Sequence, residues 1–176
     1  MKIVLVFFAL LFSGPSAKAG QVDNLQTVHK FYSAFAAGDA ETMAAQYADV
    51  EGPVFSDPIF IKLNVGDTRA MWKMLLSSPS KVTVNYQVEA VSDTQAIVHW
   101  QADYVLSKTN RPVRNLVTSY LTFEGGKIVR QKDQFDLCAW ARMGFGALKG
   151  TLICHLPDQT VRKEALAGLK AFKTRQ

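Results

Sequence analysis

Metal-binding and redox motifs are missing from this 176-residue sequence. It has two cysteines and three histidines, and no CxxC pair or zinc-ligand spacing joins them. His29, His99 and His155 lie far apart along the chain, so we interpret them as structural or surface residues. We therefore expect no metal ion and no other cofactor.

Patterns for nucleotide and nucleic-acid binding are also missing. The chain has no GxSxG motif, no glycine-rich phosphate loop and no patch of interleaved basic and aromatic residues. Its net charge of +5 is modest for a nucleic-acid partner. The basic residues near the C-terminus suit the negative end of a final helix: Arg162, Lys163, Lys170, Lys173 and Arg175.

The one long apolar run lies at the N-terminus. Lys2 precedes an apolar run over 3–12, Ser13-Gly14-Pro15 interrupts it, and Ala17-Lys18-Ala19 has the small-x-small pattern of a cleavage site. The run is well short of the ~20 residues that span a bilayer, and no later stretch is long enough. We expect residues 1–19 to be a signal peptide and the mature chain, from Gly20, to be periplasmic or secreted and free of the membrane.

Two cysteines, Cys138 and Cys154, remain in a chain expected to reach an oxidising compartment. One interpretation is a disulfide between them. The other is a pair of buried thiols that act as small apolar side chains. The spacing alone does not decide between the two.

Apolar residues at intervals of three and four predict helices in the first half of the chain. The first is expected from Asp23, as its N-cap, to Gly38. Asp39 and Asp67 are expected to cap the next two, Asp136 a helix that contains Trp140, and Asp158 a final helix.

After residue 81 the apolar period changes to two and predicts four strands, over about 82–88, 96–106, 113–123 and 128–135. Gly125 and Gly126 form a hairpin signal between the last two. The segment 54–60 is predicted to be a short edge strand or a loop because Pro58 cannot donate to a ladder. The pattern predicts one α+β domain over 20–176, with N-terminal helices on a curved antiparallel sheet and a helical extension from about residue 137.

The order of these elements and several segments resemble the SnoaL-like branch of the nuclear-transport-factor-2-like (NTF2-like) superfamily. The resemblance covers roughly residues 25–155 and rests on six segments: Phe31–Asp39, Phe55–Phe60, Trp100–Tyr104, Asn110–Asn115, Gly125–Val129 and Asp133–Leu137. It implies a cone-shaped α+β (cystatin-like) fold that encloses a largely apolar pocket. In related folds the outer face of the sheet often meets a partner subunit, so a homodimer is expected. Activity does not follow from fold alone.

Asp57 is the first candidate catalytic residue. It lies in an apolar stretch before Pro58, which favours an extended backbone. A carboxylate that faces an apolar cavity has a raised pKa and suits a general base. It also matches the Asp-Pro of ketosteroid isomerase. The alternative is a turn-capping Asp.

Asp133 is the second candidate, on the last strand, where SnoaL-like cyclases have a catalytic acid or base. By alternation it shares a face with Gln131 and Phe135. The alternative is a structural carboxylate paired with Arg111, Arg114 or Arg130.

The remaining candidates are expected to line the ligand pocket: Phe31, Phe55, Trp100, Tyr104, Asn115, Ser119 and Phe135. In the resemblance, Phe31 and Ser119 stand where ketosteroid isomerase has its oxyanion-hole Tyr and Asp. A phenylalanine cannot donate a hydrogen bond, which disfavours steroid isomerisation.

Three hypotheses for function follow. The first is a pocket protein that binds a small, mostly apolar molecule and isomerises or cyclises it by carboxylate proton transfer. The second is a binding module without turnover. The third is a dimerising protein-interaction domain.

Overall fold

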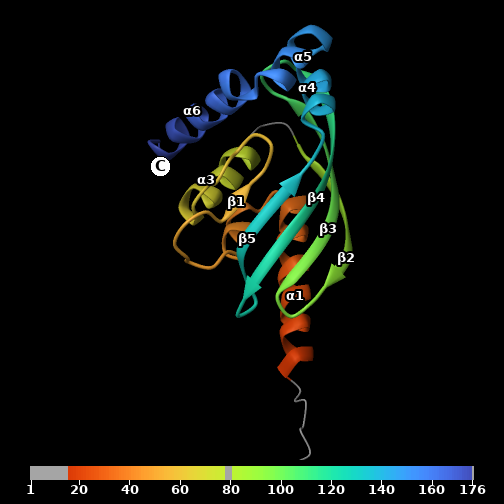
Figure 1. The fold of residues 1–176 in the computed structure, drawn as a ribbon, viewed down its shortest axis with the longest axis vertical. Coiled ribbons are helices and arrows are strands. Elements are labelled where there is room, and N and C mark those ends of the chain that lie inside the picture. Colours follow the sequence, from red (N-terminus) through yellow and green to blue (C-terminus); the bar gives the residue numbers. More distant parts are fainter. Residues whose placement is uncertain (1–15, 78–80, 176) are drawn as a thin grey trace, which may run out of the picture.

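A computed structural model describes residues 16–77 and 81–175 of the chain, and Figure 1 shows its fold. The helices are α1 (Ser16–Ala37), α2 (Ala40–Ala44), α3 (Val65–Leu76), α4 (Leu137–Phe145), α5 (Ala147–His155), the 3₁₀-helix η1 (Pro157–Gln159) and α6 (Val161–Lys173). The strands are β1 (Phe55–Ser56), β2 (Thr83–Val91), β3 (Gln95–Leu106), β4 (Arg111–Glu124) and β5 (Lys127–Gln134). The predicted α+β class is confirmed.

The N-terminus differs from the prediction. Helix α1 begins at Ser16, seven residues before Asp23, so Asp23 is not its N-cap. Residues 1–15 of the predicted signal peptide lie outside the described residues. Within the described part of the chain, no helix combines the length and apolar character that crossing a membrane requires.

The four predicted strands form the expected antiparallel meander in the sheet order β1-β5-β4-β3-β2. Gly125 and Gly126 have φ angles of 54° and 73° at the β4–β5 turn, as the hairpin signal predicted. The expectation of a wholly antiparallel sheet is wrong at one edge, because β1 pairs in parallel with β5. At this edge the backbone N–H of Gln131 donates to the backbone carbonyl of Val54 over 2.7 Å.

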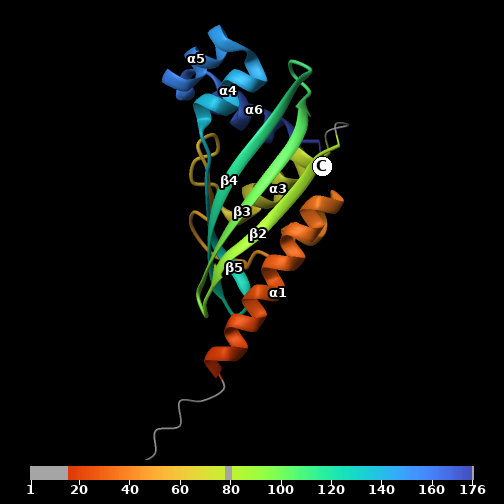
Figure 2. The ribbon, with the colours of Figure 1, turned by 90° about the vertical axis from the view of Figure 1, so that its right-hand side faces the viewer.

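One face of the sheet is covered by α1, as Figure 2 shows, and aromatic rings fill the space between them. Phe31 of α1 packs edge-on against Tyr47 and against Trp72 of α3, with ring centroids 5.8 Å and 5.6 Å apart. Each such buried side chain stabilises the fold by roughly 1.5–3 kcal/mol. The opposite face leaves Leu116 63% and Tyr120 42% exposed.

Side-chain caps fix several helix starts. Asp39 caps α2 and Asp136 caps α4, each by accepting from backbone N–H groups, and both predictions are confirmed. The cap of α3 is Asn64 rather than Asp67, whose own N–H donates to the Asn64 side chain. Asp158 is not a cap either, because it lies in η1 and pairs with Arg162 at 2.8 Å.

Helices α4 and α5 form a compact unit at one end of the sheet, in the upper right of Figure 1. Cys138 and Cys154 join them in a disulfide, with Cα atoms 4.8 Å apart. The helices lie so close that a Cβ on Gly150 would come within 2.6 Å of the Arg142 backbone. Glycine is therefore required at this crossing.

Candidate active site

Asp133 lies on the inner face of β5 and is almost completely buried. Its Oδ1 accepts a hydrogen bond from Ser119 Oγ at 2.5 Å and one from Gln131 Nε2 at 2.9 Å. Ser119 stands directly opposite on β4, so strand register alone brings the two together. Among the described residues, no arginine forms an ion pair with Asp133; Arg114 pairs with Asp103 instead.

A chain of donors that starts at Trp100 orients one side of this carboxyl group. The indole Nε1 of Trp100 donates to Ser119 Oγ over 2.8 Å. An indole N–H can only donate, so the serine oxygen accepts there and directs its own hydrogen to Asp133.

A second chain starts at Trp72 and orients Gln131. The indole of Trp72 donates to the Tyr47 hydroxyl over 2.8 Å, and that hydroxyl donates to Gln131 Oε1 over 2.5 Å. Because Gln131 accepts through its oxygen, its NH₂ group points at Asp133. Both chains thus bring donors to Asp133 without bringing a charge.

Burial raises the pKa of Asp133 to about 7. The hydrogen bonds from Ser119 and Gln131 lower that pKa, and the negative charge of Asp57 raises it. With Oδ1 engaged twice and Oδ2 only by a 3.2 Å contact from Gln131, a proton on this group belongs on Oδ2. In that form Asp133 is a buried hydrogen-bond donor near neutral pH.

Tyr32 of α1 adds a second donor beside this group. Its side chain is completely buried, and its hydroxyl has no hydrogen-bond partner among the described residues. Burial and then the Asp133 charge raise the pKa of Tyr32 well above its ordinary value, although Ser119 opposes the shift. Buried polar groups rarely lack a partner, so this hydroxyl is available for a ligand atom.

Asp57 lies just after β1 and is held by a turn. Its Oδ1 accepts from the backbone N–H groups of Ile59 at 2.7 Å and Phe60 at 2.5 Å. Burial raises the pKa of Asp57 to about 6, while these hydrogen bonds and the nearby Arg162 guanidinium lower it. Asp57 therefore does cap a turn, as the alternative interpretation of this residue expected. Its Oδ2 forms no hydrogen bond among the described residues.

The predicted pocket residues other than Trp100 and Ser119, which belong to the Asp133 network, divide into two groups. Phe31 and Phe55 are fully buried and pack against Trp72. Tyr104, Asn115 and Phe135 are partly exposed, on the side of the sheet near α4. Tyr104 accepts from the Trp140 indole at 2.8 Å, and burial raises its pKa, as does the charge of Asp57 to a smaller extent.

Tyr104 also borders an open hollow of about 520 Å³, together with Val113 of β4 and Met143 of α4. A second hollow, of about 390 Å³, lies between α3 and α6 and is lined by Leu63, Leu169 and Lys173. Neither is lined by Asp57 or Asp133. Among the predicted site residues, Tyr104 borders an open hollow, and its pKa is raised slightly by the charge of Asp57.

Sequence reasoning missed Tyr32, Tyr47, Trp72 and Gln131 as members of the site. Gln131 could have been found, since it shares the face of Asp133 by alternation. Tyr32 follows Phe31 directly in the sequence. Which of the two side chains faces Asp133 depends on how α1 is rotated about its axis, and the sequence does not specify that rotation. Trp72 and Tyr47 join the network only through tertiary packing, which no local spacing encodes.

Comparison with known proteins places the chain in a family. Residues 28–131, more than half of the chain, match the SnoaL-like domain family. The chain therefore belongs to the SnoaL-like proteins, and the resemblance seen in its sequence is confirmed. No curated protein matches it.

Solved structures show the same NTF2-like fold at low identity. An LEH-like epoxide hydrolase from M. tuberculosis has 15% identity and a TM-score of 0.55, covering 78% of this chain and 98% of its own. A proposed isomerase from Bacillus subtilis has 18% identity and a TM-score of 0.59, covering 73% and 96%. A proposed polyketide cyclase from Xanthomonas campestris has 15% identity and a TM-score of 0.61, covering 70% and 98%.

Proposed function

We propose that this chain is an exported SnoaL-like enzyme that binds a small, mostly apolar carbonyl compound and moves a proton at the carbon next to the carbonyl. The observation that carries the proposal is a buried carboxyl group, Asp133, and a partly buried one, Asp57, each held by hydrogen bonds and neither in an ion pair among the described residues. Burial raises their pKa values to about 7 and about 6. Groups with different pKa values near neutrality suit a base and an acid in one site. The similar proposed isomerase and cyclase structures support this class of reaction.

In the proposed reaction, the Asp57 carboxylate removes the proton from the α-carbon. The C–H electron pair forms a carbon–carbon double bond, and the carbonyl electrons move to oxygen. Protonated Asp133, through Oδ2, and Tyr32 donate hydrogen bonds to that oxygen. In a carbonyl compound with a double bond between its β- and γ-carbons, the new double bond is conjugated with that one, and Asp57 returns the proton to the γ-carbon. The carbonyl re-forms and the remaining double bond joins the α- and β-carbons, so that the net change is an isomerisation with no other reactant.

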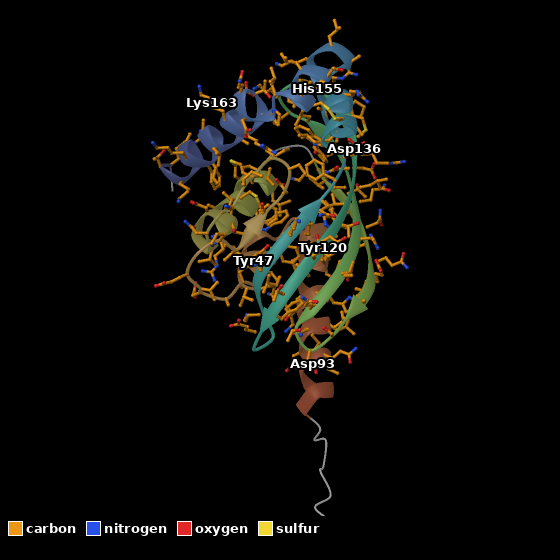
Figure 3. All side chains as sticks on the ribbon, in the orientation of Figure 1. Tyr47, Asp93, Tyr120, Asp136, His155 and Lys163 are labelled. Carbon is orange, nitrogen blue, oxygen red and sulfur yellow. A yellow bond between two sulfur atoms is a disulfide. The ribbon has the colours of Figure 1, made fainter. Side chains whose placement is uncertain are left out.

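The test is exchange of α-hydrogens of an apolar cyclic ketone for deuterium in D₂O, followed by NMR. We expect Asp57→Asn to slow exchange by 100-fold or more, since positioned bases contribute about 10²–10⁴-fold. Asp93→Asn is the matched control, because Asp93 lies in an exposed turn at the far end of the sheet, as labelled in Figure 3. No exchange above solvent in the unaltered chain, or an equal loss in both variants, would contradict the proposal and favour binding without turnover.

We also propose that two copies pair through the outer face of the sheet. Leu116 and Tyr120 are exposed there, and His99 forms a 2.5 Å contact with Glu89 on the same face. Large apolar side chains on an uncovered sheet face are typical of an interface. Leu116→Asp should convert dimer to monomer in sedimentation experiments; a monomeric unaltered chain at high concentration would contradict this.

Export is the third part of the proposal. The disulfide that joins α4 to α5 needs an oxidising compartment to persist. Together with the N-terminal signal pattern, it supports a periplasmic or secreted location.

A further inference from the structure

Helix α5 turns an apolar face to solvent. Leu148 is 92% exposed and Leu152 51%, and their spacing of four residues puts them on one side of the helix. Leu156, the C-cap residue that follows the helix, is 42% exposed. The other side carries Gly150 and Ile153, which are buried. Figure 3 labels His155 on this helix, at the end of the molecule farthest from the start of α1.

The exposed leucines are held in place. The disulfide and the close approach at Gly150 fix α5 to α4. Thr109 and Arg111 in turn donate to the backbone carbonyls of Gly144 and Met143 at the end of α4. The leucines therefore cannot turn into the core without breaking these contacts.

The C-terminal segment that contains α4, α5 and α6 carries the positive charge. Residues 137–176 contain seven basic and two acidic residues, a net charge of +5, whereas residues 20–136 contain eleven and thirteen, a net charge of −2. Residues 137–157 contain no Asp or Glu at all. Among the described residues, Lys149, Lys163 and Lys170 form no ion pair, and Figure 3 labels Lys163 on α6.

We propose that this apex, the exposed leucines of α5 with the free lysines of α5 and α6, docks on the surface of an anionic phospholipid bilayer. Leu148, Leu152 and Leu156 would enter the interfacial region while the lysines lie near lipid phosphates. Exposed leucines beside basic side chains suit the surface of an anionic bilayer, because the apolar groups enter the interface while the cations stay near the phosphates. A second copy of the chain fits less well, because two apices would bring net charges of +5 together.

The apex lies close to the open hollow that Tyr104 borders. Met143, which borders the hollow beside Tyr104, belongs to α4, the helix against which α5 packs. Docking would hold that hollow near the bilayer, where apolar molecules are concentrated. The inference about docking does not depend on the proposed catalysis.

The test is co-sedimentation of the chain, as recovered after export, with vesicles of phosphatidylcholine alone or mixed with phosphatidylglycerol. We expect binding to the mixed vesicles only, weakened by salt. Leu148→Ser with Leu152→Ser should lower the partition coefficient by about tenfold or more, because two exposed leucines no longer enter the lipid.

Two matched controls make the result specific. Leu75→Ser removes a leucine that is 43% exposed on α3, outside both proposed surfaces, and should leave the partition unchanged. Lys163→Gln with Lys170→Gln should weaken binding, whereas Lys132→Gln on β5 should not. The proposal is overturned if the unaltered chain does not bind mixed vesicles at low salt, or if apex and control variants lose binding equally. Ketone exchange by the apex variants in solution should remain at the unaltered rate, which separates this outcome from failure of the proposed function.

Discussion

At the scale of single residues, the site depends on how burial and hydrogen bonding act on two carboxyl groups. Asp133 receives only neutral donors, so nothing offsets the cost of burying its charge except Ser119 and Gln131. Asp57 accepts from two backbone N–H groups and feels the positive charge of Arg162, and both effects lower its pKa. The charged form is therefore better supported at Asp57, which suits the proposed base, than at Asp133, which suits the proposed acid.

Burial of Asp133 also predicts a pH dependence of stability. Its folded pKa of about 7 lies above its ordinary value of 3.8, so folding favours the protonated form. The stability gained is complete below about pH 4 and is lost as the pH rises to about 7. Asp133→Asn imitates the protonated group, so we expect it to raise the free energy of unfolding at pH 8 by about 1–2 kcal/mol or more. Urea denaturation at pH 4.5 and pH 8 measures this; equal destabilisation at both pH values would contradict it.

The donor chain through Tyr47 gives a second prediction at this scale. Tyr47→Phe leaves the Trp72 indole and Gln131 Oε1 without their buried partner. We expect a loss of about 1–3 kcal/mol in the free energy of unfolding. Tyr120→Phe, on the exposed sheet face, is the control and should change it by less than about 0.5 kcal/mol. Similar small losses in both would mean that the network contributes nothing.

At the scale of helices and strands, local patterns predicted most of the fold. The four-strand meander, its glycine hairpin and the caps Asp39 and Asp136 follow from residues close in sequence. The parallel pairing of β1 could not be predicted, because a two-residue strand is defined by its distant partner β5. The cap of α3 was misplaced because Asn64 and Asp67 both suit a helix start, and only the backbone conformation distinguishes them.

Two glycines in the C-terminal helices give opposite predictions. Gly150→Ala puts a Cβ within 2.6 Å of the Arg142 backbone, so the helices must separate and the protein should lose about 1–3 kcal/mol of stability. Gly168→Ala in α6 meets nothing within 4 Å and should gain about 0.5–1 kcal/mol from helix propensity. Thermal unfolding of both variants tests the α4–α5 crossing; a stabilising Gly150→Ala would show that the helices are not in contact.

At the scale of the whole molecule, charge and shape divide the chain into two ends. The meander with α1 and α3 holds the carboxyl groups, and the disulfide-linked α4 and α5 project beyond the sheet (Figure 1). Composition alone revealed the basic C-terminal residues, which we interpreted as a solvated helix end. Only the structure shows exposed leucines beside them.

The proposed export predicts the covalent state of the whole chain. The exported protein should begin at Gly20 and should carry no free thiol, because Cys138 and Cys154 are joined. Reduction of this disulfide opens a loop between two residues 16 positions apart in the sequence. It should lower the free energy of unfolding by about 3 kcal/mol. Intact mass spectrometry with thiol labelling checks both points, and a full-length chain with two reactive thiols would contradict them.

The central claim, that Asp57 and Asp133 form an acid–base pair, is tested most directly by following their side-chain carboxyl ¹³C signals in an NMR pH titration. Asp57→Asn and Asp133→Asn assign the two signals. The account predicts midpoints of about 6 for Asp57 and about 7 for Asp133, with the Asp133 midpoint falling in Asp57→Asn because a neighbouring negative charge is removed. Two midpoints near the ordinary value of 3.8, unchanged by substitution of the other residue, would contradict it.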